Sequence, residues 1–262
     1  MPLSPLTHSR VFQYVFGEPE GLPILESLVN AHFEAAGLPS VHSLQFLPRE
    51  LGPEHVDEKL AIVDLVAVDE TGRQVNIEVQ TTRKPAYFER TLFYWARLYS
   101  RQLPKGEDYT GLRPVVSINL LEYDYSPDTS WLHYHRLPHT DHLGFIFVEL
   151  PKLVRAAAPS PDLKNAAIWG KFLERPEAQA TGATPEMAQA LQAAFGRMED
   201  FMALTPEVLG EIKAEMEHLD WLSVRNEAKR EDAAAMLAEG LPVEQVSRIT
   251  GLPLEDVQAL RA

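Results

Sequence analysis

The hydrophobic residues near the start of the chain change from helical to strand periodicity. Between residues 22 and 33 they recur at three- and four-residue intervals, which predicts a helix that ends at Gly37. Residues 41–47 alternate loosely and predict a first strand. Residues 60–68 are almost continuously apolar and β-branched, which is typical of a buried strand, except for an aspartate in the middle.

That aspartate, Asp64, is expected to face a second acidic residue across a hairpin. Residues 74–80 alternate strictly between apolar and polar side chains, which predicts a strand with Glu78 on its polar side. Residues 69–72 have the composition of a turn, so the two strands should pair antiparallel. If the loop consists of residues 70–72, counting inward sets Asp64 opposite Glu78, with Cβ atoms roughly 4.5–5.5 Å apart.

A long helix predicted over residues 86–102 concentrates positive charge. Arg90, Arg97 and Arg101 are seven and four residues apart and therefore share one face. The opposite face is apolar and is expected to pack in the core; it carries Phe88, Leu92, Trp95 and Tyr99. Residues 83–105 contain six basic residues and one acidic residue, a local charge of +5.

Further strands are predicted over residues 114–121, 133–137 and 143–150. The order of helix, strand, two-stranded hairpin, helix and strand predicts an α/β fold with a central mixed sheet flanked by helices.

The character of the sequence changes after Lys152, because residues 157–161 have the composition of a joint and the remainder is rich in Ala and Glu. We expect a core domain over residues 1–155 and a helical region over residues 156–262. Its last part, residues 226–262, predicts three short helices.

Composition and charge limit the possible classes of protein. The chain has no cysteine, which excludes disulfides and thiolate zinc sites and is consistent with a reducing cytoplasm. It contains no apolar run of membrane-spanning length and begins without a signal peptide, so we expect a soluble cytoplasmic protein without membrane contact. The net charge of −14 argues against nucleic-acid binding through the whole surface, so any DNA contact must be local.

Two neighbouring carboxylates are the clearest candidate for chemistry. An aspartate inside an apolar strand is costly unless it is paired, protonated or bound to metal. Adjacent carboxylates such as Asp64 and Glu78 repel each other unless a cation lies between them, and their oxygens suit Mg²⁺ or Mn²⁺. The alternative is structural: Asp64 hydrogen-bonds to a loop, and Glu78 and Gln80 line the wet face of an edge hairpin. The spacing alone does not identify a nuclease.

Several segments resemble one family in both sequence and order. DEKLAIVDLVAVDETGRQVNIEVQ and YFERTLFYWARLYSRQL closely resemble the PD-(D/E)XK nuclease family transposases, also known as the Rpn family of recombination-promoting nucleases. SRVFQYVFG is similar to the N-terminal signature of that family, and GLRPVVSINLLEY and FVELPKL are similar to its later motifs. The resemblance covers roughly residues 8–155, and the helical tail is also similar.

The resemblance implies a restriction-endonuclease-like core and Mg²⁺-dependent DNA cleavage, with Mn²⁺ as a substitute and no organic cofactor. It implies that Asp64, Glu78 and the backbone carbonyl of Val79 bind the metal. Gln80 takes the place of the catalytic lysine of the wider superfamily, and Lys59 matches a lysine that contacts phosphate or orders the site. The basic side chains expected to bind DNA are Arg83, Lys84, Arg90, Arg97 and Arg101.

Three positions depart from the pattern. Val63 stands where the superfamily has proline, which is a common variation. Gln80 is uncharged and cannot act as a general base, so water activation would depend mainly on the metal. Gln13 stands where relatives often have lysine, which weakens any contribution from the first helix.

Two other features have structural interpretations that we favour. His133, His135, His139 and His142 form a histidine-rich segment, but no acidic partner completes a zinc site, so we expect a surface strand. Residues 234–262 have a helix-turn-helix rhythm but few basic residues. We expect this segment to serve docking or oligomerisation, and the protein to form a homo-oligomer.

Three functional hypotheses follow. The first is a metal-dependent DNA endonuclease. The second is a noncatalytic DNA-binding or assembly protein on a degenerate nuclease core, which the intact Asp64, Glu78 and Gln80 set argues against. The third is a toxin or phage-defence nuclease that uses the same site, which the sequence does not separate from a mobile-element enzyme.

Overall fold

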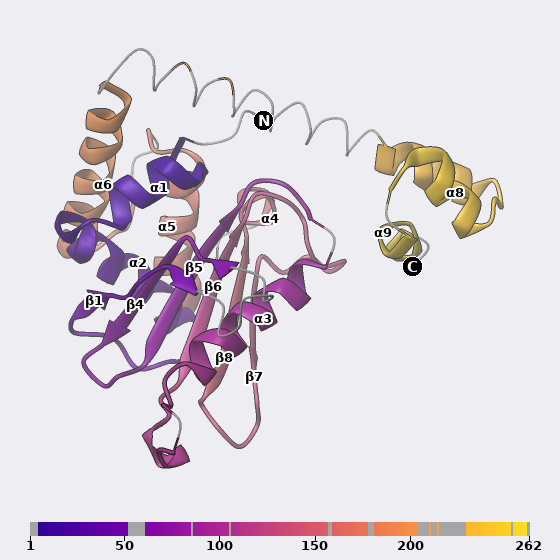
Figure 1. Cartoon of the computed structure of the whole chain (residues 1–262). Helices are drawn as coiled ribbons and strands as arrows, with labels where there is room; N and C mark the ends of the chain where they lie inside the picture. The colour runs from indigo at the N-terminus through magenta and orange to yellow at the C-terminus, as the bar shows by residue number, and fades with distance from the viewer. Residues whose placement is uncertain are drawn as a thin grey trace.

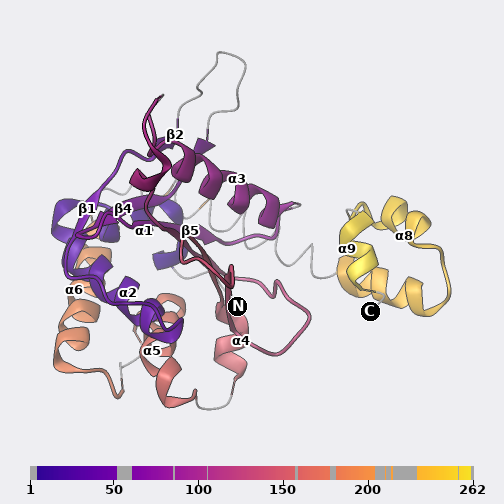
Figure 2. The same ribbon diagram turned by 90° about the horizontal axis from the view of Figure 1, so that it is seen from below.

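The structure, a computed structural model, describes residues 5–51, 61–84, 86–104, 106–156, 159–177, 181–203, 210, 214, 229–252 and 254–260. Its first part has three layers: a sheet in the middle, a group of helices on one face and α3 (Tyr87–Ser100) on the other (Figures 1 and 2). The helices of the first group are α1 (Ser9–Phe16), α2 (Leu22–Ala35), α5 (Lys164–Glu174) and α6 (Pro185–Ala203). The short helix α4 (Leu150–Arg155) connects the sheet to α5.

The sheet is mixed, as the sequence predicts. Its strands are β1 (Leu44–Phe46), β4 (Leu65–Asp69), β5 (Gln74–Gln80), β6 (Val115–Leu121), β7 (Leu132–Arg136) and β8 (Leu143–Glu149). They are arranged in the order β1-β4-β5-β6-β8-β7, in which β5, β6 and β8 are parallel and the other pairs are antiparallel. The strands β2 (Glu50–Leu51) and β3 (Ala61–Ile62) form a separate pair.

The alternation along β5 decides what each face of the sheet contains. The apolar side chains of Val75, Ile77 and Val79 lie in the large core with α1, α2, α5 and α6. The polar side chains between them therefore face α3, because successive side chains of a strand point to opposite faces. The sequence predicts this division, and it leaves a row of polar groups beneath one helix.

The hairpin has the loop length on which the predicted register depends. Leu65 pairs with Ile77 and Val68 pairs with Gln74, and the Asp69 amide donates to the Arg73 carbonyl at 2.9 Å. The Asp69 carboxylate fixes the loop, since it accepts from the Thr71 amide at 2.8 Å and from the Arg73 side chain at 2.8 Å. Gly72 has φ of 86°, which suits glycine in a tight loop. The predicted register is confirmed.

The predicted orientation of α3 is wrong in part. Phe88 and Leu92, expected in the core, are 37% and 40% exposed, whereas Tyr87, Thr91 and Leu98 are buried. The buried line is thus displaced by about one residue along the helix. The reason is that the sheet face beneath α3 is polar and accepts hydrogen bonds from Tyr87 and Thr91. The spacing of apolar residues contains no information about these bonds.

Helices on both sides of residue 155 share one hydrophobic core. Trp169 of α5 and Leu191 of α6 are buried in the same cluster as Phe16 of α1 and Leu28 of α2. The division of the chain after residue 155 stays a prediction, but α5 and α6 pack as part of the first three-layered unit.

The end of the chain has the short helices that its pattern predicts. Residues 229–238 are helical, α8 spans Val243–Thr250 and α9 spans Leu254–Ala259. They have a small core of their own around Val246 and Val257. Among the described residues, no helix combines the length and apolar character that crossing a membrane requires.

Acid is expected to destabilise the protein through His32 of α2. The side chain is fully buried, and burial lowers the pKa of His32 from 6.5 to about 4. The folded state therefore binds this proton less tightly than the unfolded state, so the stabilisation is complete above pH 6.5 and is lost as the pH falls toward 4. The shift corresponds to about 3 kcal/mol.

Urea unfolding at pH 7 and pH 4 measures this effect. His32→Gln, which cannot titrate, is expected to lose about 3 kcal/mol less than the native chain over this range. His139→Gln, at an exposed position, is the matched control and should behave like the native chain. An equal acid loss in the native chain and in His32→Gln would contradict the prediction.

Candidate active site

The strand predicted over residues 60–68 is interrupted at Asp64, between β3 and β4. The register would pair Val63 with Val79 in the hydrogen-bonded ladder. Instead, the Val63 amide donates to the Arg49 carbonyl at 3.2 Å, and the Val79 amide donates to the Asp64 carboxylate at 2.9 Å. The Asp64 side chain therefore replaces a ladder acceptor and is held beside β5.

Asp64 and Glu78 meet at this break. The Asp64 amide donates to the Glu78 carboxylate at 3.3 Å, and the Glu78 side chain is nearly buried. Burial, and then the charge of Asp64, raise the pKa of Glu78 to about 8. Burial also raises the pKa of Asp64, although the Val79 amide and the Arg90 charge act against it. Both shifts favour the protonated carboxyl groups, so a cation between them would favour their ionisation.

The atoms around the break fit a small divalent ion. The Gln80 carbonyl accepts from the Glu122 amide on the β6 side, so the preceding Val79 carbonyl points toward β4 and Asp64. Because the ladder is interrupted, that carbonyl accepts from the side-chain amide of Gln80 at 2.8 Å. The carbonyl oxygen has a second lone pair for a further contact. Two carboxylates and one carbonyl are hard oxygen donors, and Mg²⁺ often takes one or two carboxylates and completes its shell with water.

The Gln80 side chain contacts the helix above the sheet. Its side-chain oxygen accepts from the Arg90 guanidinium of α3 at 2.6 Å. That guanidinium also lies over the rings of Tyr87 and Tyr94, with its central carbon 5.0 and 6.0 Å from their centroids. Its charge partly offsets the burial that raises the pKa of both Asp64 and Glu78. Arg90, expected from the sequence to bind DNA, is therefore adjacent to the carboxylates.

The sequence interpretation missed a buried polar residue on the next strand. Asn119 of β6 pairs in register with Glu78, and its side-chain oxygen accepts from the Tyr87 hydroxyl at 2.8 Å. Burial raises the pKa of Tyr87 well above its ordinary value, and Glu78 adds to the effect. A lone asparagine in the apolar run of residues 114–121 was the available signal.

The remaining basic residues lie at different places around the site. Lys84 and Arg101 are exposed, and Lys84 lowers the pKa of Asp64. Arg83 is partly buried and donates to the Asp124 carbonyl at 3.4 Å. Arg97 is 9% exposed and lies over Phe93, so it is not an open phosphate contact in this structure. Lys59 lies outside the described residues.

Arg49 was also missed by the sequence interpretation. It precedes β2, and its side chain donates to the Asp64 carbonyl at 3.4 Å. Its charge lowers the pKa of Asp64. No sequence signal placed it there, because residues 48–58 carry no periodicity.

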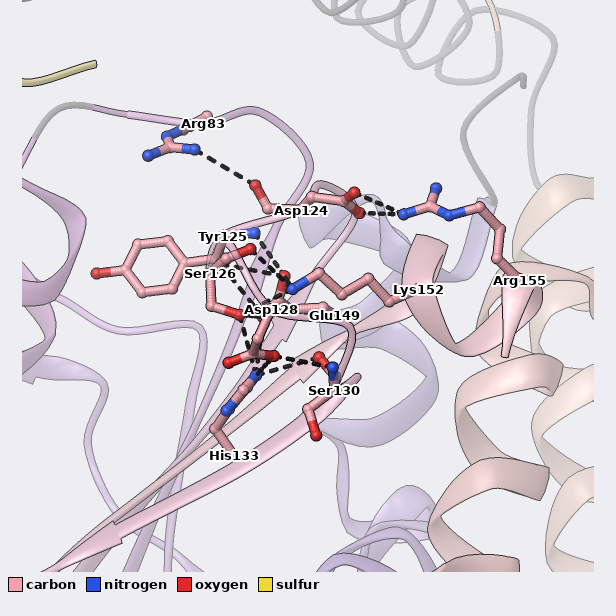
Figure 3. A network of polar contacts seen from close by, with 10 residues as sticks. All are labelled: Arg83, Asp124, Tyr125, Ser126, Asp128, Ser130, His133, Glu149, Lys152 and Arg155. Atoms are coloured by element: carbon pink, nitrogen blue, oxygen red, sulfur yellow. Dashed lines mark hydrogen bonds and ion pairs between the residues drawn. The ribbon is translucent and has the colours of Figure 1, made fainter. Parts of the chain in front are cut away.

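A polar network fixes the loop that follows β6 at the same edge of the sheet (Figure 3). Glu149 is fully buried, lies in the same cross-strand row as Gln80, and accepts from the Tyr125 amide at 2.6 Å and from Lys152 at 2.8 Å. Figure 3 also shows Arg155 paired with Asp124, whose carbonyl accepts from Arg83. The network therefore holds the loop beside Arg83.

His133 of the histidine-rich segment is part of this network. The His133 Nε2 atom lies 3.2 Å from the Glu149 carboxylate and 3.1 Å from the Ser126 hydroxyl. Throughout the described part of the chain, no three or more His, Asp or Glu side chains are grouped so that they could hold a metal ion. The candidate site offers two carboxylates and one backbone carbonyl.

Comparison with known protein families shows the family to which the chain belongs. A family model described as PD-(D/E)XK nuclease family transposase matches residues 9–228. The chain belongs to this family. No curated protein and no solved structure matches the chain significantly.

As a PD-(D/E)XK nuclease family transposase, the chain has the expected mixed sheet flanked by helices. The match contains Asp64, Glu78 and Gln80 and continues through α5 and α6, which share the core of the sheet. Family membership supports a nuclease- or transposase-like function and implies DNA as the substrate. Nucleases of this superfamily generally use divalent metals, which agrees with the oxygen donors at the break.

Proposed function

We propose that the protein is a metal-dependent DNA endonuclease that hydrolyses phosphodiester bonds. The observation that supports this best is the pair of carboxylates at the interrupted strand, with the Val79 carbonyl directed toward it. Asp64, Glu78 and that carbonyl would hold Mg²⁺, or Mn²⁺ in its place. When bound, such an ion lowers the pKa of a water molecule and neutralises charge on the phosphate.

The side chains of the site have separate tasks in this proposal. Glu78 is buried and Asp64 is partly buried, which favours a cation between their carboxylates. Gln80 lies at the end of β5, and the second lone pair of its side-chain oxygen can orient the attacking water. Gln80 cannot remove a proton, so proton transfer from that water must end on solvent or on the DNA.

Local positive charge provides the contact with the DNA backbone. The basic segment carries +5 in a chain of net charge −14, and Lys84 and Arg101 are exposed on it. Arg83 flanks the loop held by Glu149. Lys59 is a further proposed phosphate contact. Charges limited to one region would hold phosphates near the carboxylates without binding DNA over the whole surface.

A plasmid-nicking assay with the full chain tests the proposal. We expect supercoiled DNA to become nicked in Mg²⁺ or Mn²⁺, no nicking in EDTA, and binding without nicking in Ca²⁺. DNA binding with no cleavage in any divalent ion would instead support a noncatalytic protein on the same fold. Cleavage that persists in EDTA would contradict the metal site. A toxin or defence nuclease would use the same site, so cleavage does not separate it from the first proposal. Toxicity of the protein on expression would favour that role.

A further inference from the structure

The guanidinium of Arg90 is held by contacts with both the sheet and its own helix. It donates one hydrogen bond to the strand below, to the Gln80 side-chain oxygen at 2.6 Å. Two tyrosine rings of its own helix, Tyr87 and Tyr94, flank it. A planar cation held by one bond and two rings has a fixed position, unlike an exposed arginine that moves freely with solvent.

The donors of Arg90 are not exhausted by these contacts. Its Nε atom is buried and has no acceptor among the described residues. A guanidinium offers five N–H donors, and leaving one of them buried without a partner costs free energy. The Nε atom has almost no accessible surface in this structure, so a substrate oxygen would satisfy this donor only after the Arg90 side chain shifts to expose it.

The charge of Arg90 acts on the same two carboxylates that are proposed to bind metal. It is close enough to lower the pKa of both Asp64 and Glu78. Two carboxylates, one divalent ion and one guanidinium together have a single net positive charge. Such a centre is complementary to a phosphodiester that gains negative charge as water attacks it.

We propose that Arg90 is a catalytic residue that contacts the scissile phosphate, and that Gln80 is the residue that positions it. This inference rests on the proposed function, and it changes the role of both side chains. Arg90 stabilises the phosphate in the transition state rather than tethering the DNA backbone at a distance. Gln80 is uncharged. Its side-chain oxygen holds the charged guanidinium of Arg90 in position.

Single-turnover cleavage and DNA affinity distinguish these roles. Arg90→Gln is expected to reduce the cleavage rate about 100-fold, as for loss of one preorganised donor to a transition state. Its DNA affinity in Ca²⁺ should change by less than about threefold, because the contact with the phosphate strengthens mainly in the transition state and contributes little to binding of the intact DNA. A backbone tether would give the opposite result, a loss of affinity with a nearly normal rate at saturating DNA.

Moving the charge to the strand gives a sharper test. A lysine at position 80 places a cation beside the carboxylates from β5 instead of from α3. The double variant Gln80→Lys with Arg90→Gln is therefore expected to cleave at least about 10-fold faster than Arg90→Gln alone. Arg136→Gln is the matched control, since Arg136 also lies over a tyrosine ring but is on the edge strand β7. It should cleave like the native chain.

Metal binding gives a measurement that does not depend on cleavage. Mn²⁺ affinity, measured by titration calorimetry, should stay the same or increase in Arg90→Gln, because a like charge near the ion is removed. If Arg90→Gln does not fold, Gln80→Leu replaces it, with an expected rate loss of about 10-fold and unchanged DNA affinity.

Three results would overturn the inference: a rate for Arg90→Gln within about threefold of the native chain, a parallel loss of Mn²⁺ binding, or no gain in the double variant. If the native chain cleaves and Asp64→Asn does not, any of these results rejects the role of Arg90 and leaves the proposed function intact. A native chain that never cleaves rejects the proposed function itself.

Discussion

Replacing Asp64 with asparagine is expected to reduce metal-dependent DNA cleavage by about 1,000-fold or more, and Glu78→Gln should have a similar effect. Each substitution keeps the shape of the side chain and removes one negative charge. Asparagine can still accept from the Val79 amide, as Asp64 does at 2.9 Å, so the interrupted strand is preserved. The loss would therefore come from the charge that holds the cation, and not from a changed fold.

Rates of supercoiled-plasmid nicking in Mg²⁺ measure this prediction, with circular dichroism to confirm folding. Asp162→Asn is the matched control, because Asp162 is an exposed aspartate next to α5, on the other face of the sheet from α3. It should cleave at the native rate. Cleavage by Asp64→Asn at more than about a tenth of the native rate would remove Asp64 from the metal site.

The positions of Asp64 and Glu78 were predictable because a hairpin with a short loop has few possible registers. Asp69 and Gly72 fix the loop length, and the strict alternation of residues 74–80 fixes which face each side chain occupies. The interruption at Asp64 was not predictable, since a continuous apolar run gives no sign that a carboxylate replaces a ladder acceptor. The interruption leaves the Val79 carbonyl, which points toward the candidate site, without its donor in the ladder.

The role of Arg90 depends on tertiary contacts that periodicity does not contain. Helical spacing places Arg90 and Arg97 on one face and indicates a shared role in DNA binding. In the structure Arg90 bonds to Gln80, whereas Arg97 is almost buried over Phe93. The two arginines differ because the sheet beneath α3 is polar near Gln80, and because the buried line of the helix is displaced from its apolar pattern.

Glu149 shows the same limit for the loop at the edge of the site. It is the last residue of the apolar strand β8, where a single acidic residue usually marks the surface. Instead it is fully buried and binds Lys152, which lies three residues later. An acidic and a basic residue at that spacing were visible in the sequence, but their burial depends on the loop that they hold.

The metal-free protein is expected to lose stability through Glu78 as the pH rises from about 4.5 to about 8. Burial and the charge of Asp64 raise the pKa of Glu78 from 4.5 to about 8. The folded state therefore binds this proton more tightly than the unfolded state does. Its contribution to stability is complete below pH 4.5 and is lost as the pH rises through about 8, with a total on the order of 5 kcal/mol.

Urea unfolding in EDTA, compared between the native chain and Glu78→Gln at pH 5 and pH 9, isolates this effect, because other titrating groups such as His32 contribute equally to both proteins. The native chain should lose several kcal/mol more than Glu78→Gln over this range. Saturating Mn²⁺ should reverse the difference, because the ion binds the ionised carboxylate and stabilises the native chain more as the pH rises. Parallel pH profiles in EDTA would show that Glu78 ionises freely without metal. The electrostatic repulsion between the Asp64 and Glu78 carboxylates would then not contribute to the binding of a cation.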